Sequence, residues 1–287
     1  MKKLAIVFVL GVCCASLSAA TPLFPYVLGH PVTGNITEVT GEVEAALVET
    51  GFEIVGGYSP YDGAQVVVVT HPVLQSTAAG SPMGGFAAAL RVGVTENDGK
   101  IEVSYSNPAW LANICRLDGD LEPVATALET ALGREREFGS KKGKEAKQLR
   151  KYHYMAFMPF FDDPVELASH PTHEQAVAAV EAGLAAGKAG TSKVYRVDVP
   201  GKDEVLFGVA LTTGKGADEA VMATTDTGAL KHTPHLPYEL LVSGSKVYTL
   251  HGKFRIAQSF PDLGMGTFMK ISGAPGAIHE ALEAAAQ

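Results

Sequence analysis

The sequence predicts an α+β protein built from two related domains, each ordered strand, helix, several strands, helix. Short apolar runs bounded by turn-forming residues are typical of strands, and a few amphipathic segments at helical spacing flank them. Consecutive strands joined by short turns pair antiparallel, with helices on one face, which argues against a doubly wound parallel sheet. The third observation is an internal repeat, which divides the chain into the two domains.

The first segment, 1–20, has the features of a signal peptide. Lys2 and Lys3 precede the apolar run 4–12, and a small-residue cleavage site follows near Ala20. The apolar run is too short to span a membrane, and no later stretch is long enough. Lipid anchoring at Cys13 is disfavoured because Val12, not a small residue, precedes it. We therefore expect a soluble exported protein, in the periplasm or secreted, with no membrane span.

Composition limits the remaining possibilities. The 46% hydrophobic content supports real cores, and the formal net charge is −8. Two of the three cysteines leave with the signal peptide, so Cys115 can form no intramolecular disulfide. We expect Cys115 to be a small buried apolar residue. The alternative is a reactive thiol or a ligand, with Arg116 lowering the pKa of the thiol. The acidic balance and the export signal argue against nucleic acid as a partner.

The first helix of the first copy begins near Asn35. Asn35 and Glu38 form a capping box, and Gly51 ends the helix. Gly56-Gly57 suggests a bulge in the first of the following strands. Asn97-Asp98-Gly99 is a strong hairpin turn. In order, we expect strands over 52–58 and 65–70, a loop with a short helix over 72–85, strands over 88–95 and 100–105, and helices over 109–115 and from Pro123.

The second copy repeats this plan. Thr172 and Gln175 mark a helix start, and Pro275 opens the last helix. A hairpin is expected over 246–258, with its turn at His251-Gly252. Strands are expected over 152–160, 194–199, 205–211 and 238–242.

Three matches in the same order define the repeat. Gly99-Lys100 recurs as Gly252-Lys253, 127–131 resembles 281–285, and 43–47 resembles 180–184. The predicted domains are therefore 21–135 and 152–287, with extra residues in the middle of the second. Between them, 136–151 is rich in lysine and arginine. It is a solvated linker or, alternatively, a patch for an anionic partner.

The first copy resembles the family named domain of unknown function 302. The similar residues are 90–94, then 98–105 with its Ser-Tyr ending, then Asn107-Pro108-Ala109-Trp110-Leu111-Ala112. The resemblance covers about Val39 to Leu132 and implies a compact β-α-β-β-β-β-α unit, alone or in tandem, with no known activity. The second copy departs from the pattern, because the repeat places Phe260 opposite Asn107 and Leu263 opposite Trp110.

Candidate site residues are few. Tyr105, Asn107 and Trp110 either shape the turn or line the rim of a ligand pocket, and Cys115 lies close by in sequence. Two His-x-x-His pairs contain or adjoin proline in predicted loops, and they are surface residues or weak metal ligands. These pairs are His170 with His173 and His232 with His235. No nucleophile elbow, phosphate loop or haem motif is present.

These observations favour a non-enzymatic binding or accessory protein without a cofactor. Its partner is a small molecule or another protein, and a homodimer is one state that it could adopt. Two alternatives stay open. One is a redox protein, metal-handling protein or enzyme that uses Cys115 or the histidine pairs. The other is a structural or assembly module.

Overall fold

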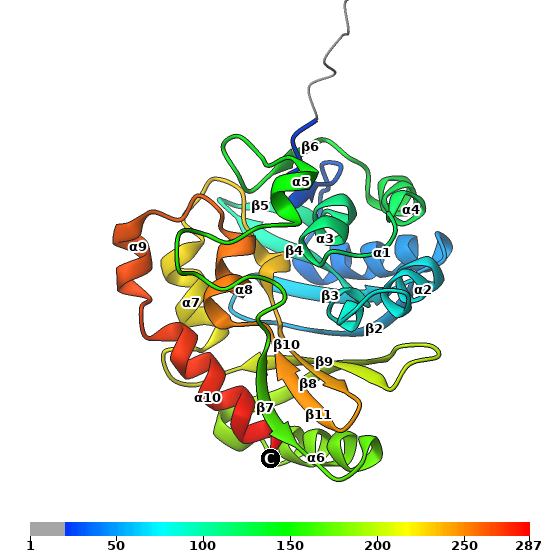
Figure 1. Ribbon diagram of the computed structural model, residues 1–287. Helices are drawn as coiled ribbons and strands as arrows, with labels where there is room; N and C mark the ends of the chain where they lie inside the picture. Colours follow the sequence, from blue (N-terminus) through cyan, green and yellow to red (C-terminus); the bar gives the residue numbers. More distant parts are fainter. Residues whose placement is uncertain (1–20) are drawn as a thin grey trace, which may run out of the picture.

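The protein has an α+β fold, as predicted, in which α-helices surround one 11-stranded sheet (Figure 1). The structure is a computed structural model that describes residues 21–287; the predicted signal peptide lies outside the described residues. Every pair of neighbouring strands in the sheet is antiparallel. The strand order is β6-β1-β5-β4-β3-β2-β8-β9-β10-β11-β7. Within residues 21–287, no helix is both long and apolar enough to cross a membrane.

The first half of the chain follows the predicted order closely. Asn35 caps the first helix, since its side chain accepts from the amides of Thr37 and Glu38. The register between the second and third strands shifts between Ile54 and Gly56, which confirms the predicted bulge. The elements are β1 (Tyr26–Leu28), α1 (Ile36–Glu49), β2 (Glu53–Tyr58), β3 (Ala64–Thr70), α2 (Pro72–Ala79), the 3₁₀-helix η1 (Gly84–Ala87), β4 (Leu90–Asn97), β5 (Lys100–Ser106), α3 (Pro108–Ile114) and α4 (Glu122–Leu132).

The second half has the same succession with two additions, a 3₁₀-helix after its first helix and one helix near its end. Thr172 caps α6 by accepting from the amide of Gln175, as its sequence predicts. The elements are β7 (Val165–Ser169), α6 (His173–Ala185), η2 (Lys188–Gly190), β8 (Thr191–Asp198), β9 (Glu204–Leu211), α7 (Asp218–Thr225), η3 (Thr233–His235), β10 (Tyr238–Ser243), β11 (Lys246–Thr249), α8 (Gly252–Ser259), α9 (Met265–Lys270) and α10 (Ala274–Ala286).

The sheet has the same strand order on both sides of its centre. Outward from the centre, one half runs β2-β3-β4-β5-β1 and the other runs β8-β9-β10-β11-β7. The halves join where β2 pairs with β8, with Gly56 opposite Tyr195. A Cβ atom on Gly56 would lie 2.2 Å from the carbonyl oxygen of Val194. Only glycine therefore permits the approach of these two strands.

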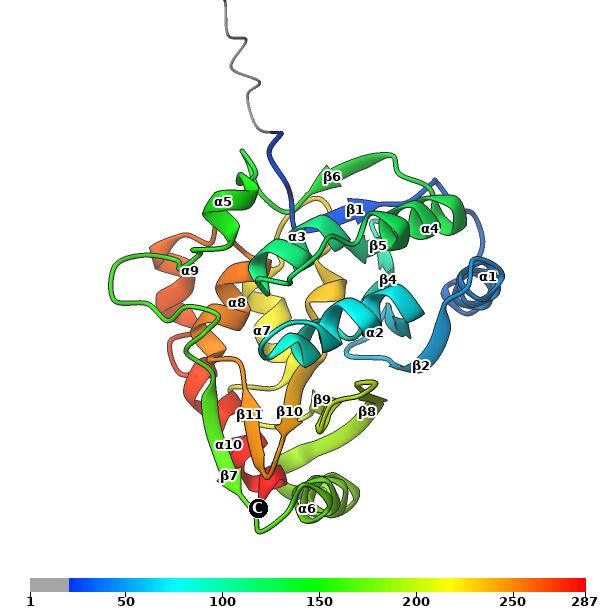
Figure 2. The ribbon, with the colours of Figure 1, turned by 45° about the vertical axis from the view of Figure 1, so that its right-hand side comes forward.

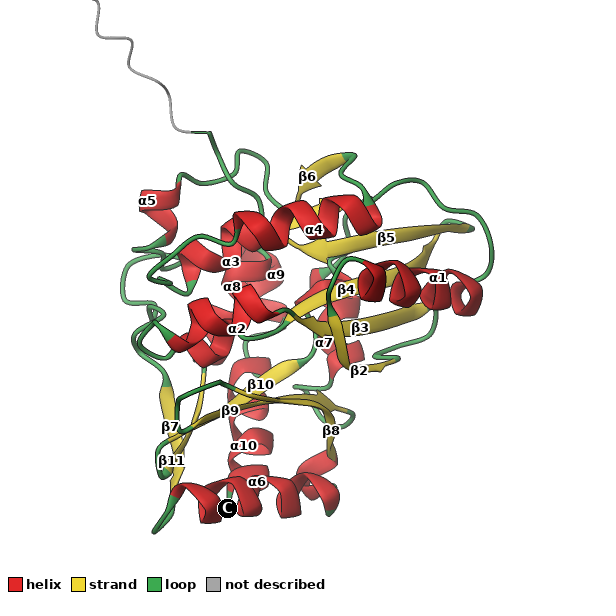
Figure 3. Cartoon of the chain, turned by 90° about the vertical axis from the view of Figure 1, so that its right-hand side faces the viewer, coloured by secondary structure: helices red, strands yellow, loops and turns green. Residues whose placement is uncertain are grey.

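The two halves also exchange short segments. Figure 3 shows β3, β4 and β5 above β8, β9 and β10. Between them, η3 packs on β3, β4 and β5, while η1 packs on β9 and β10. The hydroxyls of Thr233 and Thr95 are 2.6 Å apart, and the amide of Gly85 donates to Glu204 at 3.1 Å. Each half thus covers part of the other's sheet, so neither half is a separate body.

Two hydrophobic cores follow from this arrangement. In the first half, α1 and α4 pack against each other beside the sheet, and α6 and α10 do the same in the second half (Figure 2). The core of the first half also includes side chains from the second half, among them Tyr195, Leu241 and Phe254. The core of the first half therefore extends into the second half, because their inner sheet faces meet.

The strand predicted over 152–160 is wrong. This segment forms turns and loop, and the edge strand beside β11 is β7 instead. Tyr152 is buried, and its hydroxyl donates to the carbonyl oxygen of Ala257 at 2.9 Å, but its backbone belongs to no strand. Phe157 is fully exposed with φ of 66°, a conformation that no strand contains. Apolar composition without regular alternation misled the prediction.

The predicted hairpin turn at His251-Gly252 is also wrong. The hairpin joins β10 to β11 through Gly244 and Ser245, and Gly252 begins α8. His251 caps this helix by accepting from the amide of Lys253. Glycine suits position 252 because a Cβ atom there would lie 3.1 Å from the Cα atom of Pro275, closer than ordinary van der Waals contact. The glycine reflects close helix packing and not a turn.

This correction changes which residues correspond between the halves. Asn107 and His251 both follow the fifth strand and cap the next helix. The residues three positions on are Trp110 and Phe254, both buried. The sequence-based matches of Asn107 with Phe260 and of Trp110 with Leu263 are therefore misplaced in the fold.

The basic segment 136–151 is more than a solvated linker. Arg136–Phe138 forms β6, which extends the sheet beside β1, and Ala146–Leu149 forms α5. Phe138 and Leu149 are buried. The high content of charged residues hid the two apolar side chains that attach this segment to the fold.

Candidate functional site

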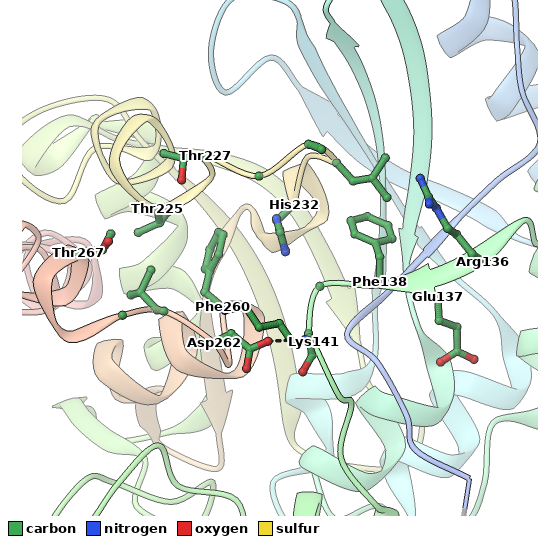
Figure 4. A pocket seen from close by; sticks show the side chains of 17 residues that line it. Arg136, Glu137, Phe138, Lys141, Thr225, Thr227, His232, Phe260, Asp262 and Thr267 are labelled. Carbon is green, nitrogen blue, oxygen red and sulfur yellow. Dashed lines mark hydrogen bonds between the residues drawn. The ribbon is translucent and has the colours of Figure 1, made fainter.

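A cavity of about 630 Å³ lies where β6 meets the second half of the chain (Figure 4). Three segments form its walls: β6 with the loop after it, the end of α7 with the loop that leads to η3, and the loop after α8 with the beginning of α9. The lining residues are Arg136, Glu137, Phe138, Gly139, Ser140, Lys141, Thr225, Thr227, Gly228, Ala229, Leu230, His232, Phe260, Asp262, Leu263, Gly264 and Thr267.

His232 is the most firmly positioned polar side chain of this cavity. Its Nδ1 lies 2.7 Å from Oδ1 of Asp226, and its backbone amide donates to Oδ2 of the same carboxylate at 2.8 Å. The His232 side chain is 14% exposed and that of Asp226 only 3%. The carboxylate fixes the orientation of the ring and occupies Nδ1, which leaves Nε2 as the nitrogen available to a ligand.

Three aromatic rings surround His232. The ring centres of Tyr26, Phe138 and Phe260 lie 5.1, 5.6 and 4.8 Å from the imidazole centre. In Figure 4 the imidazole lies between Phe260 and Phe138 and projects into the cavity. Phe138 and Phe260 line the cavity together with His232, so this part of its wall is apolar around one polar group, a combination found in small-molecule sites. The rest of the lining includes hydroxyl-bearing and charged side chains.

The loop from 226 to 232 is held by its own polar groups. Asp226 ends α7, where its amide donates to the carbonyl oxygen of Met222 at 2.8 Å. The Lys231 ammonium lies 3.4 Å from the carbonyl oxygen of Asp226 and 3.3 Å from that of Gly228. These bonds position His232 before any ligand arrives.

Charged groups are distributed unequally around the cavity. Glu137 pairs with Arg134, and Asp262 accepts from the backbone amide of Lys141. Arg136 and Lys141 are exposed, and neither has an ion-pair partner among residues 21–287. Asp262 also has no ion-pair partner in this range, so the lining carries two positive and two negative groups, and the two cations are those without a carboxylate partner.

None of the four residues expected at a ligand site near the first hairpin lines this cavity. Tyr105 is buried, and its hydroxyl donates to the carbonyl oxygen of Gly133 at 2.9 Å. Asn107 caps α3, accepting from the amide of Ala109. Asn107 and Trp110 do line a second, much smaller cavity of about 30 Å³. Cys115 is buried outside both cavities.

Burial determines the chemistry of Cys115. It raises the pKa of the thiol to about 12, and the nearby guanidinium groups of Arg91 and Arg255 offset this only in part. At neutral pH the group is a thiol and not a thiolate, so it is a poor nucleophile. Arg116, which the sequence suggested as an activator, pairs with Asp162 instead.

The predicted histidine pairs have separate surroundings. His170 lies 3.0 Å from the carbonyl oxygen of Ala286, and His173 lies 2.8 Å from that of Gly244. His235 is buried. Its Nδ1 lies 2.9 Å from a guanidinium nitrogen of Arg255, and its Nε2 lies 3.2 Å from the Tyr238 hydroxyl. Burial holds its pKa well below the ordinary value, so it is neutral. Of the four, only His232 faces the large cavity.

Metal binding finds no ready site in the part of the chain that the structure describes. No group of three or more His, Cys, Asp or Glu side chains is arranged to hold an ion there. The sequence did suggest His232, but only through its spacing from His235. Its hydrogen-bond partner is Asp226, six residues earlier, and its ring packs against Phe138 and Phe260 from distant segments. No regular spacing signals that combination.

Comparison with known proteins adds no assignment. No protein-family model matches the chain, and no curated protein sequence matches it.

Proposed function

We propose that this protein binds a small molecule with an apolar body and one acidic group in the cavity at His232. The observation that carries the proposal is the imidazole of His232, which Asp226 holds at 2.7 Å with its other nitrogen available to the cavity of about 630 Å³. Phe138 and Phe260 offer stacking surfaces to an apolar ring. Arg136 and Lys141 favour an acidic group at the rim.

The biological setting is part of the same proposal. The protein is an exported, non-enzymatic binding or accessory protein of the periplasm or cell exterior. Its two halves are tandem copies of a domain related to the domain of unknown function 302 family. Support for the duplication comes from the shared strand order of the two halves and from the equivalent helix caps Asn107 and His251.

Amide NMR spectra of residues 21–287 during titration with small carboxylates test the binding proposal. The probes are benzoate, phenylacetate and indole-3-acetate, with benzamide as the neutral counterpart of benzoate. We expect a carboxylate to shift the signals of 136–141 and 225–232 more strongly than benzamide. His232→Gln should weaken binding roughly tenfold or more, since a hydrogen bond to a charged group contributes about 1.5–3 kcal/mol.

The matched control is His279→Gln. His279 lies on α10, is 38% exposed and does not line the cavity, so this change should leave the affinity unaltered. If no carboxylate perturbs the cavity signals at millimolar concentration, or if both variants bind equally well, the proposed ligand site is wrong.

A second function is favoured by the same side-chain pair. An imidazole oriented by a carboxylate is the arrangement of a general base, and His232 could take a proton from a bound water or hydroxyl through Nε2. An assay with 4-nitrophenyl acetate discriminates between the two functions. Turnover that is lost in both His232→Gln and Asp226→Asn favours the enzyme, whereas equal background rates in wild type and variants favour simple binding.

A further inference from the structure

The cavity of about 30 Å³ lies between the two halves of the chain, apart from the His232 site. Residues of β1, β4 and α3 form one side, and Pro234 with residues of α8 forms the other. Every lining residue except Gln258 is buried. The volume is close to that of one water molecule or one halide ion. The lining residues are Pro25, Tyr26, Arg91, Ser106, Asn107, Trp110, Leu111, Ile114, Pro234, Arg255, Gln258 and Ser259.

Several polar atoms of these residues have no hydrogen-bond partner within the described chain, 21–287. They are the Tyr26 hydroxyl, Nε of Arg91, Nδ2 of Asn107 and Oε1 of Gln258. Buried polar groups are normally paired, and each unpaired one costs about 1–3 kcal/mol. Four such atoms around one small cavity indicate that something occupies it.

The unpaired atoms are mainly donors. The Asn107 amide is fixed, because its Oδ1 accepts from the amide of Ala109 at 3.1 Å and its NH₂ group is left without a partner among the described residues. Nε of Arg91 can only donate. Burial raises the pKa of Tyr26 above its usual range, so its hydroxyl keeps its proton and can donate. The side-chain amide of Gln258 can present its NH₂ group by turning over.

The local charge is positive. Arg91 and Arg255 share a single carboxylate, that of Glu239, and all three are buried. Burial lowers the pKa of Arg91 to about 10, so it remains charged at neutral pH. In the part of the chain that the structure describes, no aspartate or glutamate lines the cavity. The buried carboxylates Asp218 and Asp226 are bonded to Tyr58 and His232 instead.

Arg255 is already saturated, which identifies Arg91 as the cation that lacks partners. The Arg255 guanidinium donates to Glu239 at 2.9 Å, to His235 at 2.9 Å and to Ser259 at 3.0 Å. Among residues 21–287, Arg91 contacts Glu239 and the hydroxyl of Tyr195, and its Nε has no hydrogen-bond partner. A water molecule accepts two hydrogen bonds, whereas a monatomic anion accepts from all three donors and also balances the charge.

We infer that this cavity is a binding site for a monovalent halide-sized anion such as chloride, held by Tyr26, Arg91 and Asn107 between the two halves. Tyr26, Arg91 and Asn107 belong to the first half, and the amide of Gln258 is the donor that the second half can add, so the bound ion connects the halves through Gln258. The site is a different cavity from the proposed ligand site, although the ring of Tyr26 also packs against His232.

Bromide is the direct probe. Crystals of residues 21–287 grown with sodium bromide should show one anomalous peak within hydrogen-bond distance of the Tyr26 hydroxyl, Nε of Arg91 and Nδ2 of Asn107. A cavity that contains only water, with no anomalous signal, would overturn the inference.

Thermal unfolding gives an independent test. At constant ionic strength, chloride and bromide should raise the Tm of the wild type relative to gluconate, which is too large for the cavity. With Tyr26→Phe, the halide concentration needed for the same rise in Tm should be roughly ten- to a hundredfold higher, because one hydrogen bond to a charged group is lost. Tyr105→Phe is the matched control, because its hydroxyl bonds to Gly133 away from the cavity. Equal halide dependence in both variants would contradict the anion site. If Tyr26→Phe does not fold, the bromide crystals of the wild type still test the site.

Discussion

Arg91 of β4 and Glu239 of β10 form a buried ion pair that connects equivalent strands of the two halves of the sheet. Arg255 of α8 joins the same carboxylate at 2.9 Å. The inner sheet faces thus meet through charges as well as through apolar side chains. Removing one partner of such a group leaves uncompensated buried charge, whereas exposed pairs contribute little.

Glu239→Gln should therefore lower the free energy of unfolding by about 3–5 kcal/mol. Urea unfolding followed by circular dichroism measures the effect. Glu166→Gln is the control: Glu166 pairs with Lys246 at 2.7 Å, but both side chains are more than 40% exposed. That change should cost less than about 1 kcal/mol. Similar losses in both variants would show that the buried group is not a central connection.

Gly56→Ala should destabilise the protein where the two halves join. A Cβ atom there would lie 2.2 Å from the Val194 carbonyl oxygen, so β2 and β8 must separate. We expect a loss of about 1–3 kcal/mol in urea unfolding. Gly41→Ala is matched to it: Gly41 lies in α1, an added methyl carbon would have nothing within 4 Å, and alanine should stabilise the helix by about 0.5–1 kcal/mol. A neutral Gly56→Ala would mean that β2 and β8 can separate without cost.

Cys115 should be unreactive in the folded protein. Burial raises the pKa of its thiol to about 12 and shields it from reagents. With 5,5′-dithiobis(2-nitrobenzoate) at pH 8, we expect slow labelling of the native protein and rapid labelling of one thiol in urea. Fast native labelling would instead support the redox hypothesis for Cys115.

Asp218 should make stability decrease as the pH rises. Burial raises the pKa of its carboxyl group to about 7, although hydrogen bonds from Tyr58 and Leu211 offset part of this effect. Between about pH 4 and 7 the folded state holds a proton that the unfolded state releases, so stability is fully present below about pH 4 and falls through about pH 7. The maximum contribution is about 4 kcal/mol.

Asp218→Asn isolates this effect, because the amide stays neutral. The difference in unfolding free energy between wild type and variant, measured from pH 4 to 8, should shift in favour of the variant as the pH rises. Taking the difference removes the opposite contribution of His235, whose lowered pKa makes the folded state lose stability as the pH falls below 6.5. A difference that does not change with pH would contradict the raised pKa of Asp218.

Local signals predicted much of the fold. The helix caps at Asn35 and Thr172, the Asp98-Gly99 turn and the Gly56 bulge all depend on neighbours within a few residues, and each is confirmed. The segment 152–160 and the turn at His251-Gly252 were misassigned because glycine and apolar residues serve more than one purpose. Gly252 allows close contact with Pro275, which belongs to another helix, α10.

The candidate sites depended on contacts that no local pattern records. His232 was recognised from its spacing to His235, but Asp226, Phe138 and Phe260 join it only because β6 returns to the sheet edge beside β1. Asn107 and Trp110 were recognised as a possible pocket rim, and they line the small cavity with Arg91 and Tyr26.

The sequence by itself determined the α+β class, most helix and strand positions in the first half, and the similar order of the two halves, because caps, turns and hydrophobic periodicity are local. Tertiary structure alone decided that the halves share one sheet, exchange η1 and η3, and enclose the Arg91, Glu239 and Arg255 group. The physical reason is that buried charges and apolar faces are stabilised only by partners, and those partners come from strands that lie far apart in the chain.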